Sequence, residues 1–341
     1  LGAISYPLYL WHWPALVLPS SALGRTLRLH ERFLCILLTI ILAHYTSKYV
    51  EEPLRHKKLS SRTVYKGASI TTAISLVAGV LIAFTSSSII TTKGEPSYQF
   101  DLVKVMAKPA VYGDGCHVNY GETKSGYCTY GDKESSQTIV LYGDSHAAQW
   151  FPTLEKLANE RGFKLISLTK SACPAVEAQR RNQGAFRQAD CSQWRKNSIE
   201  RIAEIKPMAV ITGNFHYYTP ENEKVSRTAW WREGQRKLLN KLRGTTKNLI
   251  YISDTPRPLR DIPNCLASRN SKVCDSSEKS RVSVIPGFEV INPTPWLCSS
   301  YCPAILDGSV AYRDASHISV EMSLKLLPKF EQALIAKGLF A

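Results

Sequence analysis

Two patterns of hydrophobic positions divide the 341-residue chain. In the first pattern, long apolar runs cover Ile4 to Leu23, which is rich in Trp and Tyr, then residues 31–50 and residues 67–90. The run at 67–90 carries no charged side chain. Because a helix needs about 20 mostly apolar residues to cross a bilayer, the runs at 31–50 and 67–90 predict membrane-spanning helices.

Beyond Thr138 the second pattern alternates short apolar runs with amphipathic stretches. The apolar runs predict strands at 139–142, 163–168, 209–212, 249–253 and 289–291, and the amphipathic stretches predict helices at 147–161, 191–204, 229–242 and 320–337. This alternation is typical of a three-layer α/β sandwich with a mostly parallel sheet. We therefore expect a membrane section over residues 1–92, a linker or extension over 93–135, and an α/β domain over 136–341.

A basic loop between the two expected membrane helices predicts their orientation. It contains Arg55, Lys57, Lys58, Arg62 and Lys66, while the loop before the first helix contains Arg25, Arg28 and Arg32. Loops rich in Lys and Arg tend to stay in the cytoplasm. If the later loop is inside, the helix from residue 67 emerges on the far side, and the chain after about residue 92 is exported.

The charge of the chain excludes one class of partner. The formal net charge is +15, but after residue 92 the basic and acidic side chains are interspersed, and no basic run alternates with aromatic residues. We therefore expect no nucleic-acid partner. The positive excess suits an anionic surface such as phospholipid headgroups or lipopolysaccharide, and the membrane helices make the lipid bilayer a partner.

The cysteines indicate the compartment. One of the nine, Cys35, lies in an expected membrane helix, and the others lie beyond the last one: Cys116, Cys128, Cys173, Cys191, Cys265, Cys274, Cys298 and Cys302. An even number in an exported part predicts disulfides, and pairing of sequence neighbours is the simplest of 105 connectivities. A zinc site is the rival interpretation, but no C-x-x-C pair is present. We expect no metal.

The candidate chemistry begins where the first strand of the α/β domain ends. Gly143-Asp144-Ser145 follows the apolar run, and a serine at the carboxyl end of a buried strand lies where open α/β sheets bind ligands. A nucleophilic serine needs a base and an orienting acid. His317 and Asp314, three residues apart on one stretch, can supply both. Taken singly, the serine could be a helix cap and His317 a packed loop histidine.

Three neighbours of these motifs are further candidates for a role in the site. Asp144 suits a helix cap better than a catalytic acid. His146 directly follows Ser145, and because adjacent side chains diverge, it suits the wall of a site better than its base. His216 is a candidate for contact with substrate or acceptor.

These motifs resemble the SGNH (GDSL-like) hydrolase and acyltransferase family. Gly143-Asp144-Ser145 resembles its first block, Gly213-Asn214 its asparagine block, and Asp314-x-x-His317 its last block. The resemblance implies a Ser145–His317–Asp314 triad and an oxyanion hole formed by the Ser145 amide and Asn214. The family's second block supplies a further donor from glycine, but the corresponding segment, 167–174, has none. Ser171 or Ala172 would stand in that place.

The first 60 residues resemble the closing segments of membrane acyltransferase-3 proteins, some of which continue into an SGNH domain. The resemblance rests on Ser5 to Pro14 and on Glu51 to Arg55. It implies that the chain, which starts at Leu1 without an initiator methionine, is the C-terminal part of a longer bacterial inner-membrane protein with a periplasmic SGNH domain. The upstream membrane acyltransferase domain would then be its partner.

The two resemblances together imply an O-acyltransferase. It would have no bound cofactor, and its acyl group, most often acetyl, would come from cytoplasmic acetyl-CoA and reach a surface polysaccharide such as lipopolysaccharide O-antigen. A carbohydrate O-acetylesterase and a non-catalytic glycan-docking module remain the alternatives, because a triad alone does not say whether water or a sugar resolves the acyl-enzyme.

Overall fold

The computed structural model describes residues 2–23, 27–56, 60–85, 88–94, 97–277 and 284–340. Contacts divide the chain into two compact units. The first contains Leu1–Leu102 and Asn264–Asn270, and the second contains Val103–Pro263 and Ser271–Ala341. Arg25, Lys57 and Lys58, on which the expected membrane orientation partly depends, lie outside the described residues.

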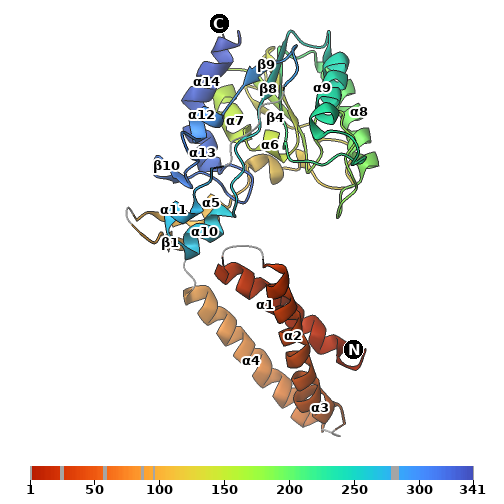
Figure 1. Ribbon diagram of the computed structural model, residues 1–341, viewed down its shortest axis with the longest axis vertical. Coiled ribbons are helices and arrows are strands. Elements are labelled where there is room, and N and C mark those ends of the chain that lie inside the picture. The colour runs from red at the N-terminus through yellow and green to blue at the C-terminus, as the bar shows by residue number, and fades with distance from the viewer. Residues whose placement is uncertain are drawn as a thin grey trace. The chain divides into compact units, whose positions relative to one another are not determined.

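The first unit is mostly helical. A 3₁₀ turn (Gly2–Ile4) leads into α1 (Ser5–Leu23), α2 (Leu29–Thr46), a π-helical segment (Ser47–Glu51), α3 (Glu52–His56), α4 (Ser61–Thr85) and the antiparallel hairpin of β1 (Ile89–Thr91) and β2 (Gln99–Asp101). Helix α1 packs against α2 (Figure 1). Trp11 Nε1 donates a hydrogen bond to Thr46 Oγ1 at 2.9 Å, so the aromatic segment is tied to the end of α2.

Two helical segments of this unit are long and apolar enough to cross a membrane. They are Leu29–Arg55 and Ser61–Leu81, which overlap the spans expected at 31–50 and 67–90. Within the described residues, the apolar window of Ser61–Leu81 has no side chain buried by protein. An apolar helix that is not covered by protein suits a bilayer, which can bury its side chains.

The second unit is built on a seven-stranded sheet. Its spatial order is β3 (His117–Val118), β6 (Lys164–Lys170), β5 (Thr138–Gly143), β7 (Ala209–Gly213), β8 (Asn248–Ile252) and β9 (Glu289–Ile291), and β4 (Thr129–Gly131) also pairs with β6. Strand β4 is antiparallel to β6, and the other neighbours are parallel. The expected mostly parallel α/β sheet is confirmed.

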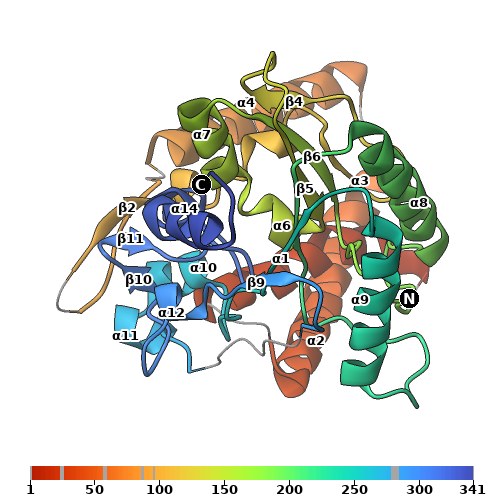
Figure 2. The same cartoon turned by 90° about the horizontal axis from the view of Figure 1, so that it is seen from above.

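Helices cover both faces of this sheet. Helices α7 (Phe151–Arg161), α13 (Val320–Lys325) and α14 (Leu327–Ala336) lie on one face, and α8 (Gln188–Ile205) and α9 (Arg227–Leu242) lie on the other (Figures 1 and 2). The apolar residues 139–142 of β5 are fully buried, as a central strand between two helical layers requires. The five expected strands are all present, with bounds within two residues of those predicted.

The structure also differs from the sequence expectations. The single helix expected at 147–161 is two helices, α6 (Ser145–Ala148) and α7, and the helix expected at 320–337 is split into α13 and α14. Pro152 and Pro328 lie at the starts of α7 and α14. Proline has no N–H for the preceding turn and is tolerated at the first helical positions, so each proline starts a new helix.

Short elements complete the chain. They are α5 (Leu102–Val105), a 3₁₀ turn (Ala110–Tyr112), α10 (Ile262–Ser268), α11 (Ser271–Cys274), α12 (Thr294–Leu297) and the antiparallel pair of β10 (Ile305–Leu306) and β11 (Ser309–Val310). Part of the segment expected as linker, 93–135, forms β3 and β4 of the main sheet. Strands of two or three residues have too little alternation to be visible in a sequence.

The carboxyl edge of the sheet gathers the segments that carry candidate chemistry. Ser145 follows β5, Ser171 follows β6, Asn214 follows β7 and Asp254 follows β8. Since these four strands are parallel, their carboxyl ends meet at one edge. From β5 the chain passes first to β6 on one side and then to β7 on the other, so β5 is where the strand order reverses. Open α/β sheets bind ligands at such a switch point.

Candidate active site

The turn after β5 presents Ser145 under tight packing. A Cβ placed on Gly143 would collide with the carbonyl oxygen of Gly213 and with the Ala147 side chain, so only glycine allows the ends of β5 and β7 to approach this closely. Asp144 caps α6 by accepting the N–H of His146 at 2.8 Å, as the capping interpretation expects. Ser145 begins α6 and is half-buried.

Asp144 does more than cap the helix. Its carboxylate also accepts the Phe215 N–H at 2.9 Å and the Tyr218 hydroxyl at 2.9 Å, and the residue is fully buried. Burial raises the pKa of Asp144 above its usual value. The bonds join the turn after β5 to the loop after β7.

The structure joins Asp314 and His317 directly. Asp314 Oδ2 lies 2.8 Å from His317 Nδ1, and Asp314 Oδ1 accepts the backbone N–H groups of Ser316 and His317 at 2.8 Å each. Burial alone would raise the pKa of Asp314, but the hydrogen bonds from His317 and Ser316 outweigh it and lower that pKa. The backbone bonds remain when the imidazole is neutral, so the carboxylate is stable as an anion that orients the ring.

The candidate base and nucleophile face the same cavity. Ser145 and His317 both line a cavity of about 480 Å³, and His317 Nε2 is buried without a hydrogen-bond partner among the described residues. The His317 ring lies 4.5 Å from the ring of His146, the neighbour of Ser145. The Ile318 N–H donates to Gln149 Oε1 at 2.9 Å, which ties the histidine loop to the end of α6. In the described structure Ser145 Oγ makes no hydrogen bond to His317.

The protonation state of His317 suits a base. The pKa of His317 is lowered to about 4, with burial as the largest cause and the positive charge of His146 as the next, while Asp314 opposes both. The ring is therefore neutral near pH 7. With Nδ1 bonded to Asp314, Nε2 is the nitrogen left to accept a proton.

The structure favours a different residue as the second candidate oxyanion donor. The Ser171 N–H donates to the Val118 carbonyl at 2.9 Å, because β3 pairs with β6, so this amide is already engaged. Ala172 lines the cavity and has a positive φ of 55°, a conformation that favours glycine. Of the two candidates, Ala172 is the one whose backbone conformation favours glycine.

The Ser171 side chain belongs to a polar network along β3 and β6. Ser171 Oγ lies 3.0 Å from His117 Nε2, and His117 Nδ1 lies 3.1 Å from Thr169 Oγ1. Burial lowers the pKa of His117 to about 3, so its ring is neutral. Ser171 also lines the cavity, so the network reaches its wall.

Asn214 and His216 contact groups other than those expected for an oxyanion donor and a substrate contact. Asn214 is buried, and its Oδ1 accepts the Ala175 N–H at 2.6 Å, while its Nδ2 lies 3.5 Å from Thr212 Oγ1. His216 packs its ring edge-on against Trp231, at 5.3 Å between centroids. Neither residue is among those that line the cavity of Ser145.

A second histidine–aspartate pair lies beside the first, and sequence reasoning missed it. His146 Nδ1 lies 2.6 Å from Asp254 Oδ1, and both side chains are buried. His146 also lines the cavity, as its interpretation as a wall residue expects. Its position in the sequence could have revealed Asp254. Asp254 directly follows an expected strand, as Asp144 does, and the carboxyl ends of parallel strands lie at one edge of the sheet.

The rest of the cavity wall is aromatic and basic. Besides the residues above, it contains Lys108, Tyr112, Tyr120, Arg180, Gln183, Phe215, Tyr217, Tyr218, Thr219, Arg313 and Ser316. Arg180 stacks between the rings of Phe186 and Tyr218, at 4.0 and 4.3 Å, and donates to the Ala172 carbonyl at 2.8 Å. A cation thus holds the strained segment after β6.

A larger cavity, of about 1200 Å³, lies away from this chemistry. Its wall includes Glu177, Trp230, Arg232 and Lys241, mostly from α9 and the segment before α8. It contains no serine paired with a histidine among the described residues. We therefore place the candidate active site in the smaller cavity, where the nucleophile, the base and the strand ends coincide.

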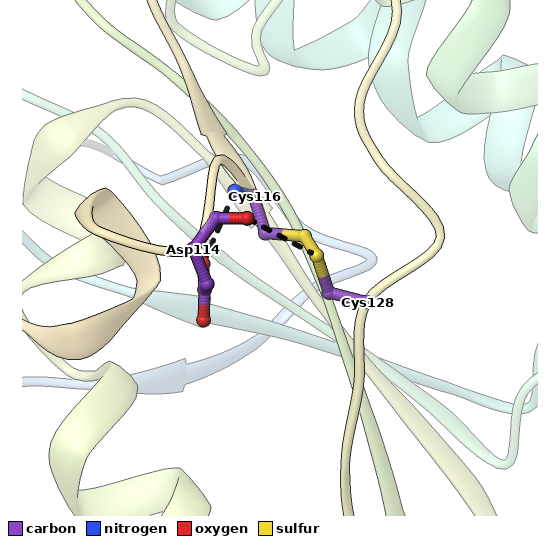
Figure 3. Close-up of side chains that lie close together, drawn as sticks. All are labelled: Asp114, Cys116 and Cys128. Carbon is purple, nitrogen blue, oxygen red and sulfur yellow. Dashed lines mark hydrogen bonds between the residues drawn. A yellow bond between two sulfur atoms is a disulfide. The ribbon is translucent and has the colours of Figure 1, made fainter.

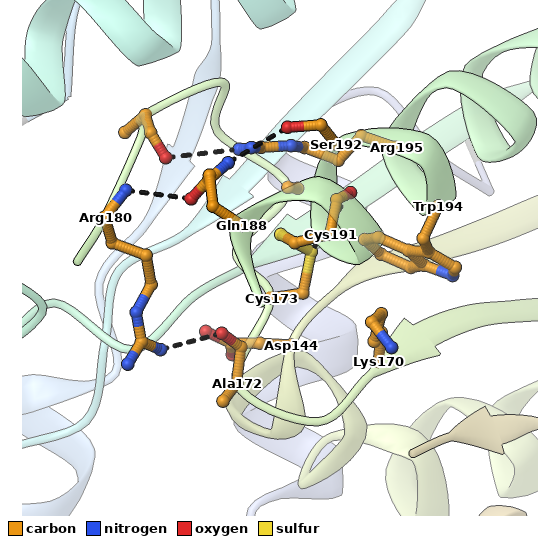
Figure 4. The surroundings of a disulfide bond; sticks show 12 residues. Asp144, Lys170, Ala172, Cys173, Arg180, Gln188, Cys191, Ser192, Trp194 and Arg195 are labelled. Atoms are coloured by element: carbon orange, nitrogen blue, oxygen red, sulfur yellow. Dashed lines mark hydrogen bonds between the residues drawn. A yellow bond between two sulfur atoms is a disulfide. The ribbon is translucent and has the colours of Figure 1, made fainter. Parts of the chain in front are cut away.

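Disulfides close several loops of the chain, and one of them is next to the site. Cys116–Cys128, Cys173–Cys191 and Cys298–Cys302 are present as the neighbour pairing predicts, Cys265 and Cys274 are also disulfide-bonded, and Cys35 is free. Figure 4 shows Cys173–Cys191 joining the segment after β6 to α8, close to Ala172 and Arg180. The site wall is thereby attached to the helical layer.

One cluster has the composition of a metal site. Asp114, Cys116 and Cys128 bring possible ligand atoms within 4.8 Å of one another (Figure 3). The two cysteines are bonded to each other, and a disulfide cannot supply the thiolates that zinc requires. This cluster, the one metal candidate in the described part of the chain, does not fit a metal.

Comparison with known proteins identifies the second unit. The sequence matches the family described as "SGNH domain (fused to AT3 domains)" over residues 115–332, well over half of the chain. The chain belongs to this family. Ser145, Asp254, Asp314 and His317 all lie within the matched residues, and the unit is called the SGNH domain below.

Two solved structures are similar to the chain. The periplasmic domain of a lipopolysaccharide acetyltransferase from Salmonella ser. Paratyphi A is 16% identical, with a TM-score of 0.49, and the match covers 66% of this chain and 88% of that one. A putative acylhydrolase from Bacteroides fragilis is 12% identical, with a TM-score of 0.34, covering 61% and 90%. A comparison with curated proteins found no match.

Proposed function

We propose that this chain is part of an O-acyltransferase, most simply an O-acetyltransferase, that modifies a cell-surface polysaccharide such as lipopolysaccharide O-antigen. One observation carries the proposal. Ser145 and the hydrogen-bonded His317–Asp314 pair line one cavity at the strand-order switch of the sheet, and His317 Nε2 is unpaired there. That arrangement supplies a nucleophile, a neutral base and an orienting acid.

The proposed first step forms an acyl-enzyme. Ser145 Oγ attacks the acyl carbonyl carbon, its proton passes to His317 Nε2, and Asp314 stabilises the imidazolium through Nδ1. The negative oxygen of the tetrahedral intermediate accepts hydrogen bonds from the Ser145 N–H and from a second amide, for which Ala172 is the better candidate than Ser171. Each such donor contributes about 10²–10³ in rate. Collapse breaks the bond to the donor, whose leaving oxygen or sulfur takes the proton from His317.

In the second step, a sugar hydroxyl attacks the acyl-Ser145 ester. His317 removes the hydroxyl proton and then returns it to Ser145 Oγ as the bond to the acyl carbon breaks. Asn214 enters this scheme as an oxyanion donor only if its amide rotates, because its Oδ1 now accepts the Ala175 N–H. We assign His216 no contact with substrate.

The membrane helices and the disulfides support a location for this chemistry. Two segments before residue 92 suit a bilayer, and the disulfides that follow suit an oxidising compartment. We propose a bacterial inner membrane protein with its SGNH domain in the periplasm. A membrane acyltransferase domain, in accord with the family description, would pass on an acyl group that begins as cytoplasmic acetyl-CoA.

Complementation in cells tests the proposal. Bacteria that lack the natural gene are given the complete protein with Ser145→Ala, and acetyl groups on the surface polysaccharide are measured by mass spectrometry. We expect acetylation to be lost at unchanged protein level. The control is Ser192→Ala, which removes a hydroxyl on α8 that lines the larger cavity but not the cavity of Ser145. Full acetylation with Ser145→Ala would contradict the proposal and favour a glycan-docking module.

Product analysis separates transfer from hydrolysis. The complete protein, purified in detergent, is given an acetyl ester and rising concentrations of an oligosaccharide acceptor. A transferase gives acetylated sugar that increases with acceptor at the expense of free acetate. Release of acetate alone at every acceptor concentration would favour the O-acetylesterase.

A further inference from the structure

His146 and Asp254 have no part in the mechanism above, although His146 lies against His317, the candidate base. Their side chains meet at 2.6 Å, and their exposed fractions are only 4% and 2%. The His146 ring lies 4.5 Å from the His317 ring and 4.8 Å from the Phe215 ring, between centroids. His146 therefore forms the wall against which the candidate base rests.

Two buried carboxylates fix this wall in place. Asp144 accepts hydrogen bonds from the backbone N–H groups of His146 and Phe215. Asp254 is hydrogen-bonded to His146 Nδ1 and accepts the backbone N–H of His216. Asp144 follows β5, Phe215 and His216 follow β7, and Asp254 follows β8, so the carboxylates tie three strand ends together. Removing Asp254 would leave a buried imidazole without its charged partner.

Titratable or charged groups from three elements face His317. Its own loop contributes Asp314 and Arg313, β3 contributes His117, and α6 contributes His146. After burial, His146 is the largest influence lowering the pKa of His317. Burial would lower the pKa of His146 as well, but Asp254 outweighs it and raises that pKa above its ordinary value. His146 thus favours its charged form at pH values where His317 is neutral.

We propose that His146 and Asp254 are positioning residues for His317. Their ion pair holds a positive charge against the His317 ring and thereby sets the pH range over which that ring accepts a proton. The proposal rests on the proposed function for the role of His317 as the base. With the charge in place, His317 stays unprotonated to lower pH. Without it, the ring becomes protonated closer to the ordinary histidine value of about 6.5.

An NMR titration of the full chain in detergent tests this directly. The protein is labelled with ¹³C at histidine Cε1, and its eight histidines give few enough signals to assign, with His317 identified by its loss in His317→Gln. We expect the His317 midpoint in His146→Gln and in Asp254→Asn to rise by at least about half a pH unit, because a nearby positive charge has been removed or discharged. In the unaltered protein, we expect His146 to titrate above 6.5 and His317 below it.

The control is His216→Gln. This variant removes an imidazole from the same loop but keeps the backbone N–H that Asp254 accepts, so the His317 midpoint should not move. Unchanged His317 midpoints in folded His146→Gln and Asp254→Asn would overturn the proposal and leave the pair a purely structural role. If neither variant folds, titration of His146 and His317 at the same ordinary pH in the unaltered protein would overturn it too.

The titration and the cell assay fail independently. The NMR midpoint of His317 does not depend on any reaction, so it tests the pair even if the protein transfers no acyl group. Surface acetylation in Ser145→Ala cells tests the proposed function even if the pair has no effect on His317. If the midpoint pH of the acid limb of kcat/KM rises in Asp254→Asn by the same amount as the NMR midpoint of His317, the two results support His317 as the base whose pKa the pair sets.

Discussion

Thr153 Oγ1 and Ser323 Oγ lie 2.8 Å apart inside the SGNH domain, and both residues are buried. Thr153 is in α7, which follows the Ser145 turn, and Ser323 is in α13, which begins just after His317. The contact spans 170 positions of sequence. It therefore joins the two helices that support the candidate nucleophile and the candidate base.

This hydroxyl pair leads to a stability prediction. Thr153→Val keeps the shape of the side chain but removes the hydroxyl that contacts both Ser323 Oγ and the Ser323 carbonyl oxygen. Ser323 Oγ is then buried without this partner, and the change costs about 1–3 kcal/mol. We expect the free energy of unfolding of the SGNH domain to fall by that amount, measured by denaturant titration of tryptophan fluorescence. Adding Ser323→Ala should recover part of the loss, since the unpaired hydroxyl is then gone. Equal losses in the single and double variants would contradict this account.

Asp314→Asn tests the orientation of the base. An asparagine amide can donate to Nδ1, which would move the imidazole proton to Nε2, the nitrogen that must accept the Ser145 proton. We expect kcat to fall by about 10³–10⁴-fold at nearly unchanged fold stability. The effect should not add to that of Ser145→Ala, because the residues act as one unit. A loss below tenfold would show that Asp314 does not orient the base.

Part of this site could be predicted from local pattern. The strand at 138–143 contains the apolar run 139–142 just before Gly-Asp-Ser, and Asp314 and His317 are close enough in sequence for one loop to pair them. Neighbouring cysteines could be matched because short loops bring them together. Each of these features depends on residues within about 20 positions of one another.

The remaining features depend on which strands become neighbours. Asp254 reaches His146 across 108 positions because β5, β7 and β8 align their carboxyl ends. The Ser171 N–H is engaged because β3, a strand of two residues, pairs with β6. The Asn214 side chain is turned toward the Ala175 N–H, in a segment that Cys173 ties to α8. No periodicity within one segment carries such information.

Two buried neutral histidines predict that acid destabilises the SGNH domain. The pKa values of His117 and His317 are lowered to about 3 and about 4, whereas an unfolded histidine has about 6.5. At pH values between these pKa values the unfolded chain binds more protons than the folded one. The contribution of the two histidines to the free energy of unfolding is therefore complete above pH 6.5 and is lost as pH falls toward 3. His146, whose pKa is raised, changes the stability in the opposite direction as pH falls, but it is one group against two.

Thermal unfolding against pH measures this effect. We expect Tm to fall between pH 6.5 and 4, each unit of lowered pKa being worth about 1.4 kcal/mol. His117→Gln keeps polar atoms for Thr169 and Ser171 but cannot titrate, so the dependence of Tm on pH should become shallower. The same steepness in His117→Gln and in the unaltered protein would assign the acid sensitivity to other groups.

Ala172 leads to a prediction that links backbone strain to the oxyanion site. Its φ of 55° costs an L-residue about 1–2 kcal/mol, whereas glycine adopts it freely but loses about 0.4–1 kcal/mol through its more flexible unfolded chain. Ala172→Gly should therefore be neutral or stabilise the domain by up to about 1.6 kcal/mol, with kcat retained because the amide stays in place. Ala172→Val, whose branched side chain resists positive φ, should destabilise the domain and lower kcat together. Chemical denaturation and initial rates measured on both variants check the pair, and a loss of activity in Ala172→Gly at full stability would mean that the methyl group, rather than the backbone, serves the site.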